Sequence, residues 1–296
     1  MKKFLIQFAL ILLVIACVVG VERLFHFLTD DFSYSNITSD LRYHREWDIP
    51  MEADDRMETQ KALDQPYRYL ESGSQSYVFM SEDQRYILKF FKHKRWTPHP
   101  LFATVPLPLP LDSKRKDRQR KKKERLYSTF GSCLIAYREF KKETGILFVH
   151  LNKIPVDRTM TLKDGIGFKH KIALGDVEFV LQRKAIPTDK YLLSLKKEGK
   201  LEEAKQALSS LLAFTVKRAE KGYSDKDPHL IRNFGFIDRK AVEIDIGGFH
   251  HDPKKNLKYF YTDEMRRIRG KLLPWLEGNY PELFPYAKEE LTKLIL

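Results

Sequence analysis

Asp225-Lys-Asp-Pro-His-Leu-Ile-Arg-Asn233 is followed, with Asp245 twelve residues after Asn233, by Ile244-Asp-Ile-Gly-Gly248. Between the two segments, an apolar run, an Asp-Arg-Lys turn and a second apolar run predict a tight hairpin. Such a hairpin would bring Asn233 and Asp245 side by side at its open end. Carboxylate and amide oxygens are hard ligands of the kind that hold magnesium against nucleotide phosphates, so the pattern predicts a metal site here.

A second informative region lies far upstream. Leu70-Glu-Ser-Gly-Ser-Gln-Ser-Tyr-Val-Phe-Met80 is a turn of small residues that leads into a strand, and Arg85-Tyr-Ile-Leu-Lys-Phe-Phe91 is a second strand. Lys89 lies among apolar neighbours, and lysine is almost never fully buried without a partner. An ammonium group on an apolar strand beneath a flexible turn suits the α- and β-phosphates of a nucleotide.

These segments, in this order, resemble the protein-kinase-like superfamily over roughly residues 70–249. The resemblance implies an α+β, two-lobed fold, with an antiparallel-sheet N-lobe and a reduced, mostly helical C-lobe behind an N-terminal transmembrane helix. It also implies ATP as the nucleotide and Mg²⁺, or Mn²⁺, as the metal. By resemblance, the residues that would contact the cofactor and the metal are Gly73, Ser74 and Val78 of the phosphate-covering loop, Lys89 of the strand, Gln182 of the hinge, and Asn233 and Asp245 at the metal.

The catalytic loop departs from the family pattern. Asp227 matches the catalytic aspartate, but six positions separate it from Asn233, one more than in the family, and no His-Arg precedes it. Asp225 therefore shares or takes the catalytic role. In the covering loop, Glu71 and Ser76 stand where the family has glycine.

A helix is predicted over residues 126–144, with apolar residues at helical spacing and Gly145 at its end. By resemblance, this is the helix whose glutamate pairs with the strand lysine. Glu139 is the candidate and Glu143, one turn later, is the alternate. The competing interpretation makes both of them solvent-facing partners of neighbouring lysines.

The N-terminus is predicted to be a membrane anchor or a targeting signal. Residues 4–21 are apolar apart from Gln7, at the lower length limit for a transmembrane helix. A cleaved signal peptide, or a lipoprotein signal ending at Cys17, is the alternative. Lys2 and Lys3 precede the span, so the positive-inside rule predicts a single-pass protein with a cytoplasmic N-terminus and the soluble domain on the other side.

The expected domain organisation is a membrane anchor (1–28), a juxtamembrane stalk (29–65), an N-lobe (66–185) with a Pro-rich and basic insert (96–125), and a C-lobe (186–296). Nine of the twelve residues Lys114–Arg125 are Lys or Arg. The run is either a solvated helix start or a site for anionic lipid. No stacking aromatics are interleaved with it, which disfavours nucleic acid.

The charge of +13 favours anionic partners, and the 12% aromatic content excludes a disordered chain. Cys133 is the one cysteine outside the apolar N-terminus, which excludes an intramolecular disulfide in the soluble part. The sequence therefore predicts a membrane-anchored kinase-like protein that transfers the ATP γ-phosphate to a protein or small-molecule acceptor. The alternative is a catalytically inactive, pseudokinase-type binding scaffold at a membrane, because no Ala-Pro-Glu motif follows Gly248.

Overall fold

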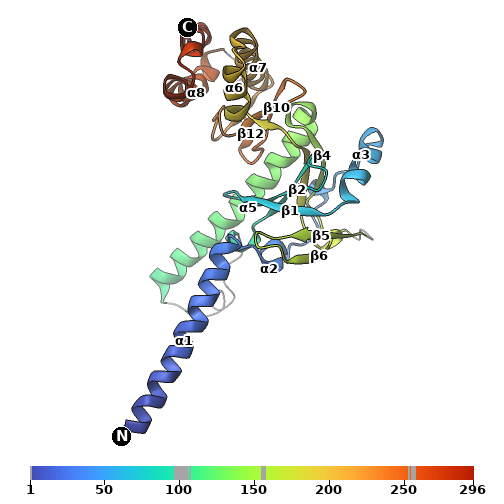
Figure 1. Cartoon of the computed structure of the whole chain (residues 1–296). Coiled ribbons are helices and arrows are strands. Elements are labelled where there is room, and N and C mark those ends of the chain that lie inside the picture. The colour runs from blue at the N-terminus through green and yellow to red at the C-terminus, as the bar shows by residue number, and fades with distance from the viewer. Residues whose placement is uncertain (1, 97–105, 107, 155–157, 253, 255–257) are drawn as a thin grey trace.

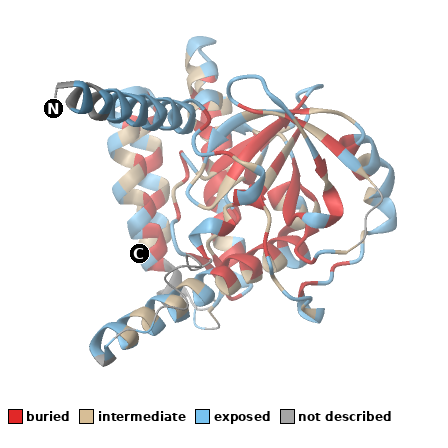
Figure 2. Ribbon diagram, turned by 90° about the horizontal axis from the view of Figure 1, so that it is seen from below, coloured by how far each residue is buried: buried red, intermediate tan, exposed pale blue. Residues whose placement is uncertain are grey.

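The structure is a computed structural model that describes residues 2–96, 106, 108–154, 158–252, 254 and 258–296. The chain begins with helix α1 (Lys2–Leu28), which projects away from the rest of the molecule (Figure 1). Within it, Leu10–Leu28 is long and apolar enough to cross a membrane, and this stretch is exposed along its length (Figure 2). Helix α1 is therefore a candidate membrane span or signal sequence.

A curled seven-stranded sheet has the strand order β4-β7-β3-β2-β1-β5-β6. Strands β1 and β5 run parallel, and the other neighbouring pairs are antiparallel. The strands are β1 (Tyr67–Ser72), β2 (Ser76–Ser81), β3 (Tyr86–Phe91), β4 (Ile146–His150), β5 (Thr159–Lys163), β6 (Lys169–Ala173) and β7 (Phe179–Arg183), with short 3₁₀ turns η2 (His93–Arg95) and η3 (Leu174–Asp176).

The β2–β3 hairpin fixes the place of Lys89. Its turn contains Gln84 at a φ of 59°, and Asp83 Oδ1 accepts hydrogen bonds from Ser81 Oγ at 2.7 Å and from the Arg85 amide at 3.1 Å. These bonds stabilise the turn and with it the register, in which Lys89 pairs with Val78 on one side and with β7 on the other. Lys89 is thereby held in the middle of the sheet.

Helix α5 (Leu109–Thr144) is longer than the sequence predicted. Its C-terminal half packs into the core, and it ends at Gly145 with a φ of 65°. The basic run Lys114–Arg125 continues the same helix outward, because ion pairs one turn apart, such as Lys121 with Asp117 at 2.7 Å, support it. The expected Pro-rich path falls mostly on residues 97–105 and 107, which lie outside the described residues.

The C-terminal part of the chain gathers at the end of the molecule opposite α1 (Figure 1). Its helices are α6 (Thr188–Lys197), α7 (Leu201–Glu220), α8 (Lys258–Asn279) and α9 (Phe284–Ile295), with the 3₁₀ turn η5 (Pro281–Leu283). Its short strands form the sheet β11-β10-β8 and the pair β12-β9, and they are β8 (Ile186–Pro187), β9 (Tyr223–Asp225), β10 (Phe234–Ile237), β11 (Lys240–Glu243) and β12 (Phe249–His251). The α+β class is confirmed.

The hairpin predicted between Asn233 and Asp245 is present as β10–β11. Phe234 pairs with Glu243 at its open end, and the turn residues Asp238 and Arg239 have φ values of 48° and 64°. Two successive positive φ values are typical of the tight turns that join antiparallel strands.

The segment 29–65, predicted as a stalk, is folded onto the domain instead. It forms α2 (Tyr34–Ile37), the 3₁₀ turn η1 (Arg45–Trp47) and α3 (Ala53–Leu63). Ile37 and Trp47 are buried in the two hydrophobic clusters of the molecule. The prediction was wrong because the few apolar residues of this polar segment fall where they cover the sheet and α5, and their burial outweighs its average composition.

Candidate functional site

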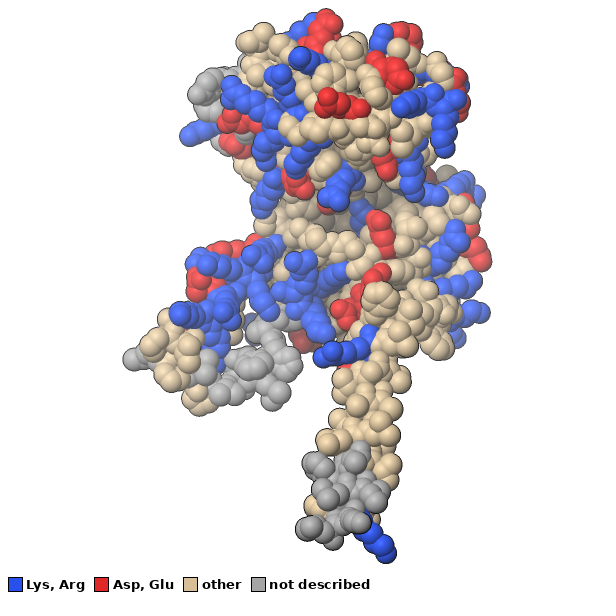
Figure 3. Space-filling model, turned by 60° about the vertical axis from the view of Figure 1, so that its left-hand side comes forward, with Lys and Arg blue, Asp and Glu red and all other residues tan. Residues whose placement is uncertain are grey.

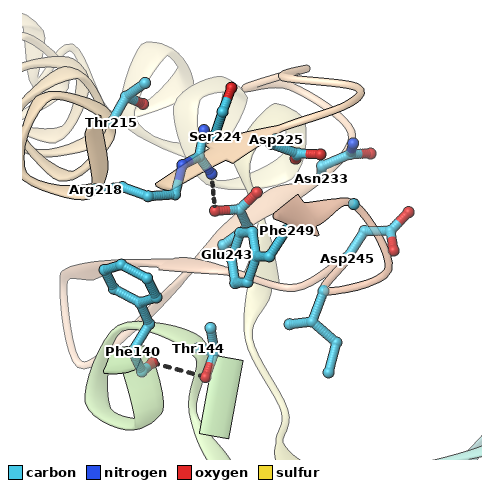
Figure 4. A network of polar contacts seen from close by, with 12 residues as sticks. Phe140, Thr144, Thr215, Arg218, Ser224, Asp225, Asn233, Glu243, Asp245 and Phe249 are labelled. Carbon is cyan, nitrogen blue, oxygen red and sulfur yellow. Dashed lines mark hydrogen bonds and ion pairs between the residues drawn. The ribbon is translucent and has the colours of Figure 1, made fainter. Parts of the chain in front are cut away.

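The open end of the β10–β11 hairpin brings two oxygen-bearing side chains together. The backbone carbonyl of Asn233 accepts hydrogen bonds from the backbone amides of Ile244, at 2.7 Å, and Asp245, at 3.2 Å, which places the two residues side by side. Asp245 is exposed, and its Oδ1 accepts the Gly247 amide at 3.2 Å. Asn233 and Asp245 lie on neighbouring segments in Figure 4, as the hairpin predicts.

Lys89 reaches this point from strand β3 of the seven-stranded sheet. Its Nζ donates a hydrogen bond to the carbonyl of Ile244, the residue before Asp245. Burial lowers the pKa of Lys89, while the nearby Asp245 carboxylate, and more weakly Cys133 and Glu71, oppose that shift. The structure thus brings a cation from residue 89 and a carboxylate from residue 245 to one place.

Glu139 does not hold Lys89. Its carboxylate is 3.7 Å from the ammonium of Lys221, and the alternate Glu143 pairs with Lys217 at 2.7 Å. The α5 residue that faces Lys89 is Cys133, whose pKa burial raises to about 12. Glu139 follows Cys133 by six residues, which rotates it by about 240° around the helix and away from Lys89. The predicted ion pair was therefore wrong.

Ser132 on α5 holds the segment after Asp245, a role that the sequence did not reveal. Its hydroxyl donates to the carbonyl of Ile246 and accepts the amide of Phe249 at 2.6 Å. Ser132 and Ile246 are both buried. One hydroxyl therefore fixes both ends of the turn that contains the two glycines, and its position beside Cys133 on the apolar face of α5 was the available signal.

The two candidate catalytic acids have opposite environments. Asp225 is 2% exposed, and its Oδ1 accepts the Asp227 amide at 3.0 Å. Asp227 is exposed and pairs with Lys271 of α8, which lowers the pKa of the Asp227 carboxyl. Asn233 Nδ2 donates to the carbonyl of Asp227 at 2.7 Å and closes the loop. Asp227 alone of the two presents a carboxylate to solvent.

A buried ionic network lies behind this loop (Figure 4). The guanidinium of Arg218 on α7 is fully buried between Glu243 and Glu264, and Ser224 Oγ donates to Glu264 at 3.1 Å. Burial raises the pKa of Glu243 well above its usual value; the attraction of Arg218 opposes the shift and Asp225 adds to it. One carboxylate oxygen of Glu243 and one of Asp225 are buried without a hydrogen-bond partner among the described residues. No local sequence pattern indicated this network.

The covering loop sits over Gly247. The Gly73 amide donates to the Ser76 carbonyl at 2.9 Å, and Lys92 Nζ donates to the Gly73 carbonyl at 2.7 Å. A Cβ atom added to Gly247 would lie 2.7 Å from Gln75 Oε1, so the Gln75 side chain packs closely on this turn. Ser74 at the loop tip is exposed.

Two further predicted residues have structural contacts. Val78 is buried and forms the strand pair with Lys89. Gln182 is buried, and its Nε2 donates to the Thr144 carbonyl at 2.9 Å, so its side chain is already occupied within the fold. A contact between the hinge backbone and an adenine stays a prediction.

The metal donors near Asp245 are few. Among the described residues, no group of three or more His, Cys, Asp and Glu side chains is gathered as a metal site. Asp245 and Asn233 supply one carboxylate and one amide oxygen, and hard cations of the Mg²⁺ type commonly take their remaining ligands from phosphates and water. This donor set fits such a cation.

Comparisons with known proteins add solved structures of low similarity. No protein-family model matches the chain, and no curated protein matches it. It is similar to the bifunctional kinase-methyltransferase WbdD at 15% identity and a TM-score of 0.33, over 75% of this chain and 41% of that one. The chain thus spans about two fifths of the WbdD chain.

Two further solved structures are similar. One is the Rv3197–erythromycin complex from Mycobacterium tuberculosis, at 14% identity and a TM-score of 0.31, over 81% of this chain and 60% of that one. The other is the streptomycin–ATP–APH(2")-IIa ternary complex, at 13% identity and a TM-score of 0.23, over 84% of this chain and 100% of that one. Similarities at these TM-scores do not indicate a function for this chain.

Proposed function

We propose that this chain is a kinase-like phosphotransferase that moves the γ-phosphate of ATP to an acceptor hydroxyl. The observation that carries the proposal is the hydrogen bond from Lys89 Nζ to the carbonyl of Ile244, beside Asp245. It joins a strand lysine of the sheet to the open end of a hairpin in the other lobe, beneath a loop of small residues. That combination suits a polyphosphate.

In the proposed site, Lys89 neutralises charge on the α- and β-phosphates and gives up its bond to the Ile244 carbonyl when it does so. Asp245 and Asn233 would hold Mg²⁺, which would supply positive charge beside the phosphates. Ser132 keeps the Asp245 segment in place through the Ile246 carbonyl and the Phe249 amide.

Transfer itself needs an acceptor oxygen in line with the γ-phosphorus. A bond forms between them as the bond from the γ-phosphorus to the β–γ bridging oxygen breaks, and ADP leaves. Asp227 orients the acceptor hydroxyl and takes its proton, because its carboxylate is exposed and its lowered pKa keeps it ionised. Asp225 positions Asp227 through the backbone amide.

A non-catalytic scaffold is the second candidate, and one observation favours it. Glu139 and Glu143 of α5 pair with Lys221 and Lys217, which leaves α5 without a glutamate on Lys89. In a scaffold the same fold would present surfaces to partners without transferring phosphate.

Helix α1 concerns the location of the proposed reaction in the cell. We propose that it anchors the chain in a membrane as a single span, because Leu10–Leu28 is apolar and exposed. The basic residues before it favour a soluble domain on the non-cytoplasmic side. Protease digestion of intact cells checks this, since a domain on that side is cut without permeabilisation.

The test of the function uses the full chain in detergent. ATP with Mg²⁺ is expected to raise its Tm, and Lys89→Met is expected to remove most of that increase. Lys205→Met, at a half-buried position of α7 that pairs with Glu202, is the matched control and keeps it. No increase with any nucleotide, with Mg²⁺ or Mn²⁺, would favour the scaffold. Transfer of labelled γ-phosphate to water or to added acceptors then separates an enzyme from a nucleotide-binding scaffold.

A further inference from the structure

A cavity of about 520 Å³ adjoins the proposed transfer site. The covering loop contributes Ser74 and Gln75 to its wall, and Gly247 of the turn after Asp245 contributes another part. The rest of the wall comes from α5, the end of η2 and the catalytic loop, through Arg95, Trp96, Lys121, Glu124, Arg125, Ser128, Thr129 and Lys226. The cavity therefore lies where an acceptor would approach.

Cationic side chains dominate this cavity. The one carboxylate in its wall, Glu124, is already bound by Arg120 at 2.7 Å. Within the described part of the chain, no carboxylate lies within 4 Å of the Arg95 or Arg125 side-chain nitrogens. Lys226, which directly precedes Asp227, donates to the hydroxyl of Ser128. Two unpaired guanidinium groups in a concave wall are a favourable place for an anion.

We propose that the acceptor of the phosphotransferase carries a phosphate group of its own, which binds in this cavity. Arg95 and Arg125 bind phosphate oxygens through their planar guanidinium forks, and the Ser128 and Thr129 hydroxyls are further donors. Because Lys226 adjoins Asp227, an acceptor held here presents a nearby hydroxyl to that carboxylate. The inference rests on the proposed function and names the substrate class of the same site.

The surroundings supply two sources of such a group. Arg95 also lines a second cavity, of about 620 Å³, together with His26 and Phe27 at the end of α1. The basic half of α5 extends in the same direction as α1 (Figure 1), and its Lys and Arg side chains gather on one face of the molecule (Figure 3). The phosphate therefore belongs either to a lipid headgroup or to a soluble phosphate ester.

The experiment uses the full chain in detergent micelles, saturated with a non-hydrolysable ATP analogue and Mg²⁺. The soluble arm titrates glycerol 3-phosphate against glycerol, and the lipid arm compares micelles containing phosphatidylglycerol with micelles containing diacylglycerol, which has no phosphate. Specific binding in either arm supports the proposal and identifies the source. Absence of binding in both arms overturns it.

A double variant, Arg95→Gln with Arg125→Gln, locates the binding. We expect at least a tenfold loss of affinity for the phosphate probe, with the Tm increase from the nucleotide retained. The matched control, Arg68→Gln with Arg266→Gln, changes two exposed arginines elsewhere and keeps the affinity. Unchanged probe affinity in the first double variant, or a parallel loss of nucleotide binding, overturns the proposal. Probe binding by a chain that fails the nucleotide test would overturn the proposed function alone.

Discussion

Two acids of one hairpin, Glu243 and Asp245, lie two residues apart and have opposite surroundings. Glu243 is fully buried against Arg218, whereas Asp245 is exposed and its nearest cation, Lys89, is bonded to a backbone carbonyl. The buried acid is not available to a ligand, because Glu243 and Arg218 are paired with each other away from solvent. The exposed carboxylate of Asp245 belongs to no ion pair among the described residues, so it is the one able to take a ligand.

The largest expected effect is on the exposed acid. Asp245→Asn removes a metal-binding carboxylate and is expected to lower γ-phosphate transfer by about 10³-fold or more, with the Tm within a few degrees of the wild-type value. Initial rates with labelled ATP and a melting curve check this. Asp263→Asn, which changes an exposed acid of α8, is the control with unchanged rates. Wild-type transfer by Asp245→Asn would contradict the assignment.

The buried group should show the reverse behaviour. Arg218→Met leaves Glu243 and Glu264 without their cation and is expected to lower the free energy of unfolding by about 3–5 kcal/mol. Denaturant unfolding measures it. Arg266→Met, at an exposed pair with Asp263, should cost about 1 kcal/mol or less. Equal losses in the two variants would remove the distinction between the two regions.

A smaller effect is expected at Ser132, which connects α5 to the exposed group. Ser132→Ala leaves the buried Phe249 amide without its partner and should cost about 1–3 kcal/mol. Because the Asp245 segment loosens, nucleotide affinity should also fall, which a titration detects. Ser210→Ala on α7, which loses a hydrogen bond within its own helix, should leave that affinity unchanged.

The smallest effect is a dependence of stability on pH. Burial lowers the pKa of His150, with Glu178 and Asp48 opposing the shift. A depressed folded pKa means that the contribution is fully present above the unfolded pKa of about 6.5 and is lost as pH falls through the folded value. The Tm should therefore decline by about 3 °C per kcal/mol lost below pH 6.5. His150→Asn should flatten that decline, and an equally steep decline in the variant would contradict this origin.

Local signals in the sequence were reliable where one segment decides its own conformation. The β10–β11 hairpin follows from the Asp-Arg-Lys turn between apolar runs, and it determines that Asn233 adjoins Asp245. Helix α5 was recognised over its buried half. For its basic half, a solvated helix start was one of two interpretations of residues 114–125, and the sequence left the choice open because an exposed helix depends on propensity and ion pairs rather than on apolar spacing.

The errors all concern which face of an element meets which neighbour. Glu139 is an acid on the predicted helix, but the rotation of α5 relative to the sheet turns Cys133, and not Glu139, toward Lys89. The mostly polar composition of residues 29–65 gave no indication that Trp47 and Ile37 are buried in the two hydrophobic clusters. An arginine on a helix would ordinarily be predicted to lie in solvent, and only the tertiary structure shows that Arg218 is buried between two acids.

The sequence by itself determined the order of the elements, the apolar first helix, the hairpin and the residue types able to hold phosphate and metal, because each depends on neighbours within a few positions. The tertiary structure alone decided that Lys89 meets Ile244 across 155 positions, that Ser132 fixes the glycine turn, and that α5 and Lys226 line the same cavity. Contacts between distant segments depend on the packing rotation of whole helices and sheets, which local sequence patterns do not encode.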